Sequence, residues 1–405
     1  MTSVALWNNY PLEYYGGGEV VALQLLPAIR GAGYSTGFYA DASFQRPERV
    51  PTGEILRLAG DIDYRKVPFQ QYGSYLPKRL FRSFPPVSAL EQHGANLVFV
   101  DRPPPSQFLA DLAKSPASRH TVLLLHGISI ERLRYLPPSL LPYQTYLRAM
   151  LGGWRSIPSE IRLLTLTASL RDYLVRHGHP PKNVRVIPNG VETRHYSVAR
   201  NDATFDIVYV GLMDRRMKGV DLLRQAVRTL SERGSPGIRF HLVGSGPDED
   251  LIRPLHNGST VFCPGFLAEA EKRALLSRAN AMIVCSRVEP FGLVVLEGLA
   301  SGLPVISTPA AGPAEILGHG PDLGKVVAPS PIGLADGLLD LHRQWLSAKE
   351  EYFTRKLARR NMAEEVFPTR AMVGAYLGLV SDLEEGRSID GPNSNPDDSS
   401  PVGAG

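Results

Sequence analysis

The chain has 405 residues, which is longer than one ordinary hydrophobic core supports, so two domains are expected. It is 43% apolar and 21% charged, with a formal net charge of +4 and dispersed basic residues, which excludes a typical nucleic-acid-binding protein. No apolar run reaches the roughly 18 to 20 residues of a membrane span, and two cysteines exclude a disulfide framework. The mild positive charge suits anionic small substrates or weak contact with an acidic membrane surface, and ordinary surface charge explains it equally well.

The N-terminus lacks the basic and apolar regions of a signal peptide. Because the chain has so few cysteines, a reducing compartment is its simplest cellular location. We therefore expect a cytoplasmic protein, with peripheral contact with the inner membrane face as a further option.

The N-terminal half alternates between strand-like and helix-like segments. Apolar runs predict strands at 4–7, 96–101, 121–127 and 161–169, and the segment 184–192 predicts a strand followed by a Pro-Asn-Gly turn. Helical spacing predicts a helix over 18–33 and a shorter one over 169–178, with Ser169 as its N-cap. Two segments rich in aromatic residues, proline and arginine, 74–87 and 131–154, predict irregular loops, or else an acceptor-binding or membrane-touching surface.

A second alternating series follows in the C-terminal half, from 205 to 309. Such alternation predicts parallel, doubly wound sheets and an α/β protein with two Rossmann-like domains. We divide the chain into four parts: an N-terminal Rossmann-like domain, a C-terminal Rossmann-like domain, a helix packing back on the first domain, and a disordered tail without an apolar face. These parts are 1–189, 190–365, 366–385 and 386–405.

Ligands of doubly wound folds sit at the carboxyl ends of the strands, so the residues there are site candidates. Gly16, Gly17 and Gly18 open the first helix and offer free N–H groups to a phosphate or sugar, although a plain flexible loop has the same sequence pattern. His126 ends another strand next to a glycine, a position that faces a ligand cleft, although a structural role fits the same pattern equally well. In the second domain, one loop carries three cations that suit a diphosphate, although ordinary surface charge explains them equally well: Arg215, Arg216 and Lys218.

The stretch 289–309 places two carboxylates in an otherwise apolar segment. Glu289 lies in a loop, and Glu297 lies about 6 to 8 Å further along the helix that follows. A loop carboxylate, a helix carboxylate and unpaired amides form a polyol-binding geometry. The amides belong to Phe291, Gly292 and Leu293.

Residues 286–316, SRVEPFGLVVLEGLASGLPVISTPAAGPAEI, resemble the Glu-x7-Glu motif of retaining glycosyltransferases with the GT-B fold. Supporting similarity occurs at 185–192, 210–223 and 241–252, and the resemblance extends from about residue 4 to 384. It implies two Rossmann-like doubly wound domains that face a central cleft. The domain over 1–189 would bind the acceptor, and the domain over 190–365 would bind the nucleotide sugar.

The resemblance also implies roles for individual residues. Glu297 would bind the ribose hydroxyls, and Glu289 with the three neighbouring amides would bind the donor sugar. Lys218 would neutralise the leaving diphosphate, with the glycine loop closing over it, and His126 would lie near the anomeric carbon. The turn 263–267, which includes Phe266, would frame the nucleobase through its backbone.

One position departs from the family pattern, because Leu212 stands where such enzymes usually carry a second diphosphate-binding arginine. Arg215 or Arg216 could restore that charge from the same loop.

The expected activity is retaining transfer of a hexose-type sugar from a UDP- or GDP-linked donor to the hydroxyl of an unknown acceptor: a glycan, a lipid-linked molecule or a small natural product. No cofactor is expected beyond this co-substrate. The acidic triplets at 61–63 and 248–250 do not follow a buried strand, so metal-independent chemistry is expected. The alternatives are a nucleotide-sugar epimerase, a glycan phosphorylase or a non-catalytic nucleotide-sugar binder; a dehydrogenase lacks its G-x-G-x-x-G motif here.

Overall fold

The structure is a computed structural model that describes residues 3–14, 16–44, 50, 52–60, 62–72, 82–100, 104–126, 157–234 and 237–389. The chain divides into two compact units. The N-terminal unit holds the described residues up to His126, those from 157 to Pro188, and those from Val373 onward. The C-terminal unit holds the described residues from Asn189 to Met372, so helix α13 (Thr369–Glu384) begins in one unit and ends in the other.

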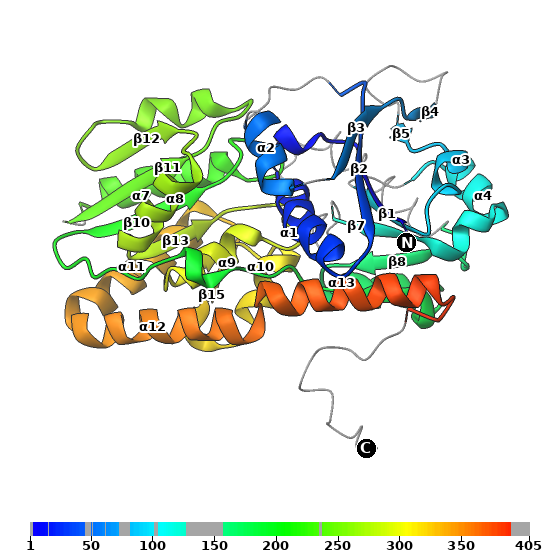
Figure 1. Ribbon diagram of the computed structural model, residues 1–405. Coiled ribbons are helices and arrows are strands. Elements are labelled where there is room, and N and C mark those ends of the chain that lie inside the picture. The colour runs from blue at the N-terminus through cyan, green and yellow to red at the C-terminus, as the bar shows by residue number, and fades with distance from the viewer. Residues whose placement is uncertain are drawn as a thin grey trace. The chain divides into compact units, whose positions relative to one another are not determined.

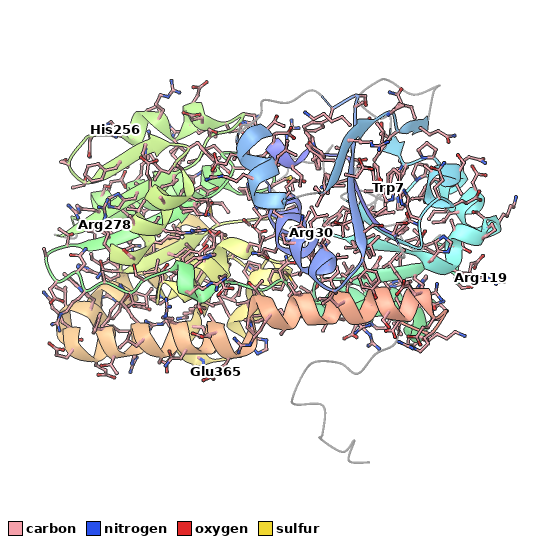
Figure 2. The ribbon with its side chains drawn as sticks, viewed as in Figure 1. Trp7, Arg30, Arg119, His256, Arg278 and Glu365 are labelled. Carbon is pink, nitrogen blue, oxygen red and sulfur yellow. The ribbon has the colours of Figure 1, made fainter. Side chains whose placement is uncertain are left out.

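The N-terminal unit is built on a seven-stranded parallel sheet with the order β3-β2-β1-β6-β7-β8-β9 (Figure 1). Its strands are β1 (Ser3–Asn8), β2 (Ser35–Asp41), β3 (Asp63–Val67), β6 (Ala95–Val100), β7 (Thr121–Leu125), β8 (Arg162–Thr165) and β9 (Val184–Val186). Its helices, besides the end of α13, are α1 (Gly17–Gly31), α2 (Thr52–Ala59), α3 (Val87–Leu90), α4 (Ser106–Lys114) and α6 (Ala168–Arg176). Trp7, labelled in Figure 2, lies in the buried core of this unit. Its ring stacks on that of Tyr39, with ring centroids 4.5 Å apart.

The C-terminal unit is built on a six-stranded parallel sheet with the order β12-β11-β10-β13-β14-β15. Its strands are β10 (Phe205–Val210), β11 (Ile238–Val243), β12 (Val261–Gly265), β13 (Ala281–Val284), β14 (Val305–Ser307) and β15 (Gly324–Val326). Its helices are α7 (Val220–Glu232), α8 (Glu269–Arg278), α9 (Leu293–Ala300), α10 (Ala311–Leu317), α11 (Pro331–Ser347) and α12 (Lys349–Val366). Apolar side chains of β10, β11, α7 and α11 fill its core, among them Phe205, Leu223 and Leu338, each fully buried.

Both sheets reverse their strand order at one point, and each reversal marks an expected ligand site. In the C-terminal unit the chain runs outward from β10 through β11 and β12, then from β13 in the opposite direction through β14 and β15. The N-terminal unit reverses in the same way between β1 and β6. Ligands of open parallel sheets bind outside the carboxyl ends of the strands that flank such a reversal. The loops after β10 and β13, and the loop after β1, are therefore the places to examine.

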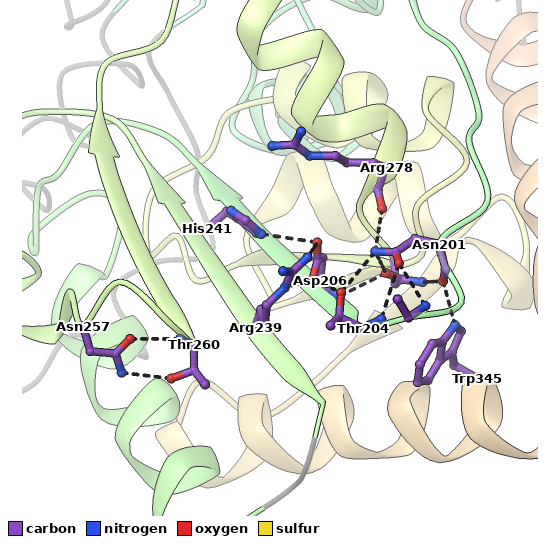
Figure 3. Close-up of polar contacts among 11 residues, drawn as sticks. Asn201, Thr204, Asp206, Arg239, His241, Asn257, Thr260, Arg278 and Trp345 are labelled. Atoms are coloured by element: carbon purple, nitrogen blue, oxygen red, sulfur yellow. Dashed lines mark hydrogen bonds and ion pairs between the residues drawn. The ribbon is translucent and has the colours of Figure 1, made fainter.

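A buried polar cluster lies at the amino ends of the strands of the C-terminal sheet, opposite the expected ligand site (Figure 3). Asp206, at the amino end of β10, is fully buried and accepts two hydrogen bonds of 2.7 Å from Arg239. Its backbone N–H donates to Asn280 Oδ1 at 3.0 Å, and Asn280 in turn donates to the carbonyl of Asn201 at 3.0 Å. The cluster ties the segment before β10 to the start of β13, and its charge is matched internally.

Several predicted elements differ from the observed ones. Strands β2 and β3 were not predicted. The half-exposed sequence of β3, DYRKV, lacks an apolar run, and this strand pairs only at the edge of the sheet. Ser169 is not an N-cap: helix α6 begins at Ala168, and Thr167, with extended backbone (φ −135°, ψ 147°), is the capping position.

The segments predicted to be irregular or disordered are described only in part. The positions 74–81, 131–154 and 390–405 lie outside the described residues. Residues 82–84 form strand β5 (Arg82–Phe84), antiparallel to β4 (Gln70–Tyr72). Of the predicted tail, residues 386–389 are described: Ile389 is fully buried, and Ser388 Oγ donates to the Lys182 carbonyl at 2.9 Å. Within the described chain, no helix is long and apolar enough to cross a bilayer.

Candidate functional site

Two loops of the C-terminal unit meet at its strand-order reversal. The backbone N–H groups of Arg287 and Val288, after β13, donate to the carbonyl of Met217, in the loop after β10, at 2.8 and 2.9 Å. Gly219 has a left-handed backbone (φ 65°), and a Cβ there would lie 2.1 Å from the Cys285 carbonyl oxygen. Only glycine therefore lets the two loops approach this closely.

This loop pairing brings Lys218 and Glu289 together. Lys218 Nζ lies 2.5 Å from Glu289 Oε2, and Ser286 Oγ donates to the same oxygen at 3.2 Å. Glu289 is only 8% exposed, so it needs these partners to offset the cost of burying a carboxylate. The two residues form a cation–carboxylate pair at the carboxyl ends of β10 and β13.

Helix α9 begins directly beside this pair. Gly292 is its N-cap, with a left-handed backbone (φ 97°), and Leu293 is its first residue. Within the described part of the chain, the amides of Phe291, Gly292 and Leu293 have no hydrogen-bond partner. Unpaired amides at a helix start attract an anion or a hydroxyl oxygen, so they add donors next to the Glu289 acceptor.

The loop before α9 is held by the segment that leads from β14 into α10. The N–H of Gly312 donates to the Glu289 carbonyl at 3.1 Å, and Thr308 Oγ1 donates to the Ser286 carbonyl at 2.6 Å. A Cβ on Gly312 would lie 2.0 Å from the Phe291 carbonyl oxygen, so the two segments touch through bare backbone. The site loop is therefore fixed by its neighbours rather than by its own sequence alone.

The second carboxylate, Glu297, has its own cationic partner. Lys272 Nζ, on helix α8, lies 2.9 Å from Glu297 Oε1 and 2.7 Å from Glu269 Oε1. Burial alone would lower the pKa of the Lys272 ammonium, but the two carboxylates raise it above its usual value. Lys272 therefore stays charged and holds Glu297 in place through one of its two carboxylate oxygens. Sequence reasoning missed Lys272, because only its Glu269 neighbour three positions earlier is visible along the chain.

Both candidate arginines are exposed. Arg215 is held by Asp248: its backbone N–H donates to Oδ2 at 2.8 Å and its Nε lies 3.3 Å from Oδ1. Asp248, which belongs to one of the acidic triplets, therefore supports this loop. Among the described residues, no group of three or more His, Cys, Asp or Glu side chains could hold a metal ion.

Arg287 was not predicted and locks the same loop. Its guanidinium is nearly buried and pairs with Asp221 at 2.6 and 2.8 Å, while also donating to the Arg215 carbonyl. Phe266 follows the end of β12 after Gly265, which has a left-handed backbone (φ 77°). The Phe266 ring is 50% exposed at the same edge of the sheet, where a planar ligand could stack on it.

In the N-terminal unit, the glycine loop is already engaged by a carboxylate. The N–H of Gly16 donates to Glu19 Oε2 at 2.7 Å, and Asn8 Nδ2 donates to Glu19 Oε1 at 2.7 Å. The prediction of a free N–H is therefore wrong for Gly16, because an acidic residue in the first turn competes for that amide. Gly17 and Gly18 form the first turn of α1.

His126, at the end of β7, is packed within the N-terminal unit. Its Nε2 lies 3.4 Å from the hydroxyl of Tyr376 on α13, and its ring meets that of Phe99 edge-on with centroids 4.8 Å apart. Burial lowers the pKa of His126 to about 3, so the imidazole is neutral at physiological pH. It can donate or accept a hydrogen bond but does not supply a positive charge.

Two family models each match one half of the chain. The family model "Glycosyltransferase Family 4" matches residues 15–195, and the family model "Glycosyl transferases group 1" matches residues 204–344. The chain is 30% identical over 183 residues to the MMP alpha-(1->4)-mannosyltransferase of Mycolicibacterium hassiacum, covering 44% of this chain and 43% of that one. It is 25% identical over 397 residues to the N-acetyl-alpha-D-glucosaminyl L-malate synthase of Bacillus anthracis, covering 91% of this chain and 94% of that one. The chain thus spans less than half the length of the first of these relatives.

Solved structures identify the fold. The sucrose-phosphate synthase of Thermosynechococcus elongatus superposes with a TM-score of 0.68 at 19% identity, covering 95% of this chain and 99% of that one. Anabaena HepE in complex with UDP superposes with a TM-score of 0.66 at 17% identity, covering 94% and 100%. These neighbours are GT-B glycosyltransferases, so the predicted GT-B fold is confirmed. The two family matches support a GT-B glycosyltransferase.

Proposed function

We propose that this chain is a retaining glycosyltransferase that moves a hexose-type sugar from a UDP- or GDP-linked donor to an acceptor hydroxyl. The observation that carries the proposal is the Lys218–Glu289 pair beside the unpartnered amides at the start of α9. It lies within the segment that the "Glycosyl transferases group 1" model matches. The structures of HepE with UDP and with UDP-glucose support a nucleotide-sugar donor.

In the proposed reaction the donor separates the Lys218–Glu289 pair. The Lys218 ammonium turns from the carboxylate to the diphosphate, and Glu289 accepts hydrogen bonds from the sugar hydroxyls. As the bond between the anomeric carbon and the diphosphate oxygen breaks, negative charge grows on the diphosphate, where the ammonium and the helix amides stabilise it. The acceptor oxygen then bonds to the anomeric carbon on the same face, and its proton passes to the leaving phosphate. No side chain need act as a nucleophile.

The nucleoside has its own proposed partners. Glu297 accepts the ribose hydroxyls, and Lys272 holds its carboxylate in the required orientation. Carboxylates are strong acceptors for paired hydroxyls, so this contact contributes to nucleotide affinity without favouring the transition state. The turn ending at Phe266 offers its backbone and an exposed ring to the base. His126 is proposed as a neutral hydrogen-bonding group for the sugar.

A panel of UDP- and GDP-linked sugars tests the proposal. We expect one donor to raise the melting temperature and to be hydrolysed slowly, releasing free nucleoside diphosphate. Glu289→Gln is the matched control and is expected to bind the free nucleotide normally while losing most of the hydrolysis. Binding without any turnover indicates instead a non-catalytic nucleotide-sugar binder, which the position of Leu212 motivates. Conversion of the donor sugar into its epimer, with no acceptor added, indicates an epimerase.

A further inference from the structure

Helix α12 carries three cationic side chains that point to the backbone ends of other helices. Lys356 Nζ donates to the carbonyl of Ala279, which caps the carboxyl end of α8, at 2.8 Å. Arg360 Nη1 donates to the carbonyl of Ala300, the last residue of α9, at 3.1 Å. Arg359 also reaches backbone carbonyls in this region. One helix therefore binds the ends of both helices that bear Glu297 and Lys272.

The burial of Lys356 is costly for simple packing. The residue is 2% exposed, and its ammonium donates to two carbonyls, those of Ala279 at 2.8 Å and Ala199 at 2.9 Å, rather than to a carboxylate. Burial and the nearby Arg359 lower the pKa of Lys356 to about 8. A methionine would fill such a position without desolvating a charge. What favours the cation here is the partial negative charge at the carboxyl end of α8.

Backbone packing brings α12 as close to α9 as the chain permits. Gly302, just after α9, has a left-handed backbone (φ 77°), and a Cβ there would lie 2.6 Å from the Lys356 carbonyl oxygen. Residues on the outward face of α12, such as Glu365, are exposed (Figure 2). The inner face of α12 therefore meets the turn after α9 with little room for either to slide.

The ends held by α12 belong to the two helices that share the Lys272–Glu297 pair. Lys272 lies near the start of α8 and Glu297 in the second turn of α9, and their charged atoms are 2.9 Å apart. The length of that contact depends on how far each helix is displaced along its axis. Lys356 fixes the position of the carboxyl end of α8, and Arg360 fixes that of α9, so both helix ends are held against α12.

We propose that Lys356 and Arg360 are positioning residues for nucleotide binding, which act by holding α8 and α9 in the register that keeps Glu297 on Lys272. The inference rests on the proposed function, because it takes Glu297 as the ribose acceptor. Neither residue is proposed to touch substrate.

The test compares four variants for binding of UDP and GDP by isothermal titration calorimetry. Lys356→Met and Arg360→Met remove the proposed contacts, Arg360→Lys keeps a donor for the Ala300 carbonyl, and Arg355→Met is the matched control. Arg355 lies on the same helix but pairs with the carboxylates of Glu351 at 2.5 Å and Asp322 at 3.6 Å. Each substitution is also made in a Glu297→Gln background.

We expect Lys356→Met and Arg360→Met to weaken binding of the preferred nucleotide roughly five- to thirty-fold, with a matching rise in donor KM and less than about a two-fold change in kcat. Arg355→Met should bind like the wild type, and Arg360→Lys should recover most of the affinity. In the Glu297→Gln background the Met substitutions should cause little further loss, because the residue through which they act is gone.

Two results overturn the inference, and they differ from failure of the proposed function. If the wild type binds UDP or GDP and the Met variants match Arg355→Met, α12 does not position the site. If the Met variants weaken binding equally with and without Glu297, they act through general stability. If the wild type binds neither nucleotide, the donor assignment fails first and the inference falls with it. Should Lys356→Met not fold, Arg360→Met and Arg360→Lys decide between these outcomes, since Arg360 is less buried than Lys356.

Discussion

The Lys218–Glu289 contact predicts that substitutions of the two residues change the free energy of unfolding and the donor turnover in different ways. Lys218→Met leaves Glu289 nearly buried, with the Ser286 hydroxyl still donating to its carboxylate. Breaking a fully buried ion pair from one side costs about 3 to 5 kcal/mol. The side chain of Lys218 is 23% exposed, so we expect a smaller loss of about 2 kcal/mol in the free energy of unfolding. Glu289→Gln should cost about 1 kcal/mol, because the Lys218 ammonium can turn to water.

The double variant Lys218→Met/Glu289→Gln removes both charges at once. Its loss of unfolding free energy should be smaller than the sum of the single losses, by a coupling energy of about 1 to 2 kcal/mol. Turnover should behave differently. A charge-assisted hydrogen bond contributes about 1.5 to 3 kcal/mol, so each single variant should lose about ten- to a hundred-fold in donor turnover, and the double variant should not recover it.

Urea unfolding and release of nucleoside diphosphate from the preferred donor measure the two quantities on the same four proteins. Losses of stability that add within about 0.5 kcal/mol would refute the ion pair in solution. Recovery of turnover in the double variant would show that both residues matter through stability alone.

Three further predictions concern the rest of the site. Glu297→Gln should weaken binding of the free nucleotide about ten-fold while Glu289→Gln leaves it within about two-fold, as measured by calorimetry; equal losses would contradict their separate roles. Arg215→Ala/Arg216→Ala should lower turnover at least several-fold if either arginine replaces the missing one at Leu212, and unchanged kinetics would show that neither does. The pKa of Lys356, lowered to about 8 from 10.5, predicts that between these pH values the unfolded chain binds the additional proton. The free energy of unfolding should therefore rise with pH in the wild type relative to Lys356→Met, by about 2 to 3 kcal/mol from about pH 7 to pH 10, and a constant difference would contradict the buried charge.

The neighbourhood of α9 was predictable because it is local. A loop carboxylate, a glycine at the helix start and a second carboxylate within the helix all lie close together along the chain, and the structure forms α9 at Leu293 with Gly292 as its cap. The alternation of strands and helices likewise predicted parallel sheets, since buried parallel strands appear as continuous apolar runs. The edge strand β3 was not predictable in this way, because its residues are only partly buried and form no continuous apolar run.

The contacts that complete the site were not predictable, because they are long-range. Lys218 meets Glu289 across 71 positions only because β10 pairs with β13, and that pairing is a property of the whole sheet. Lys272 reaches Glu297 across 25 positions, from α8 to α9, and only the packing of these two helices brings them together. Helix α12, KEEYFTRKLARRNMAEEV, has the sequence of a charged surface helix, and its buried cations are explained only by the helix ends packed against it. In the glycine loop, the sequence pattern suggested a free Gly16 N–H, but this group donates to the Glu19 carboxylate three residues downstream.

The most direct test of the proposed donor site is the structure of the chain with the nucleotide that stabilises it. We predict ribose hydroxyls within hydrogen-bonding distance of Glu297, the diphosphate against Lys218 and the amides at the start of α9, and a Lys218–Glu289 distance longer than its present 2.5 Å. A nucleotide bound elsewhere, or bound with the Lys218–Glu289 pair still closed, would contradict it.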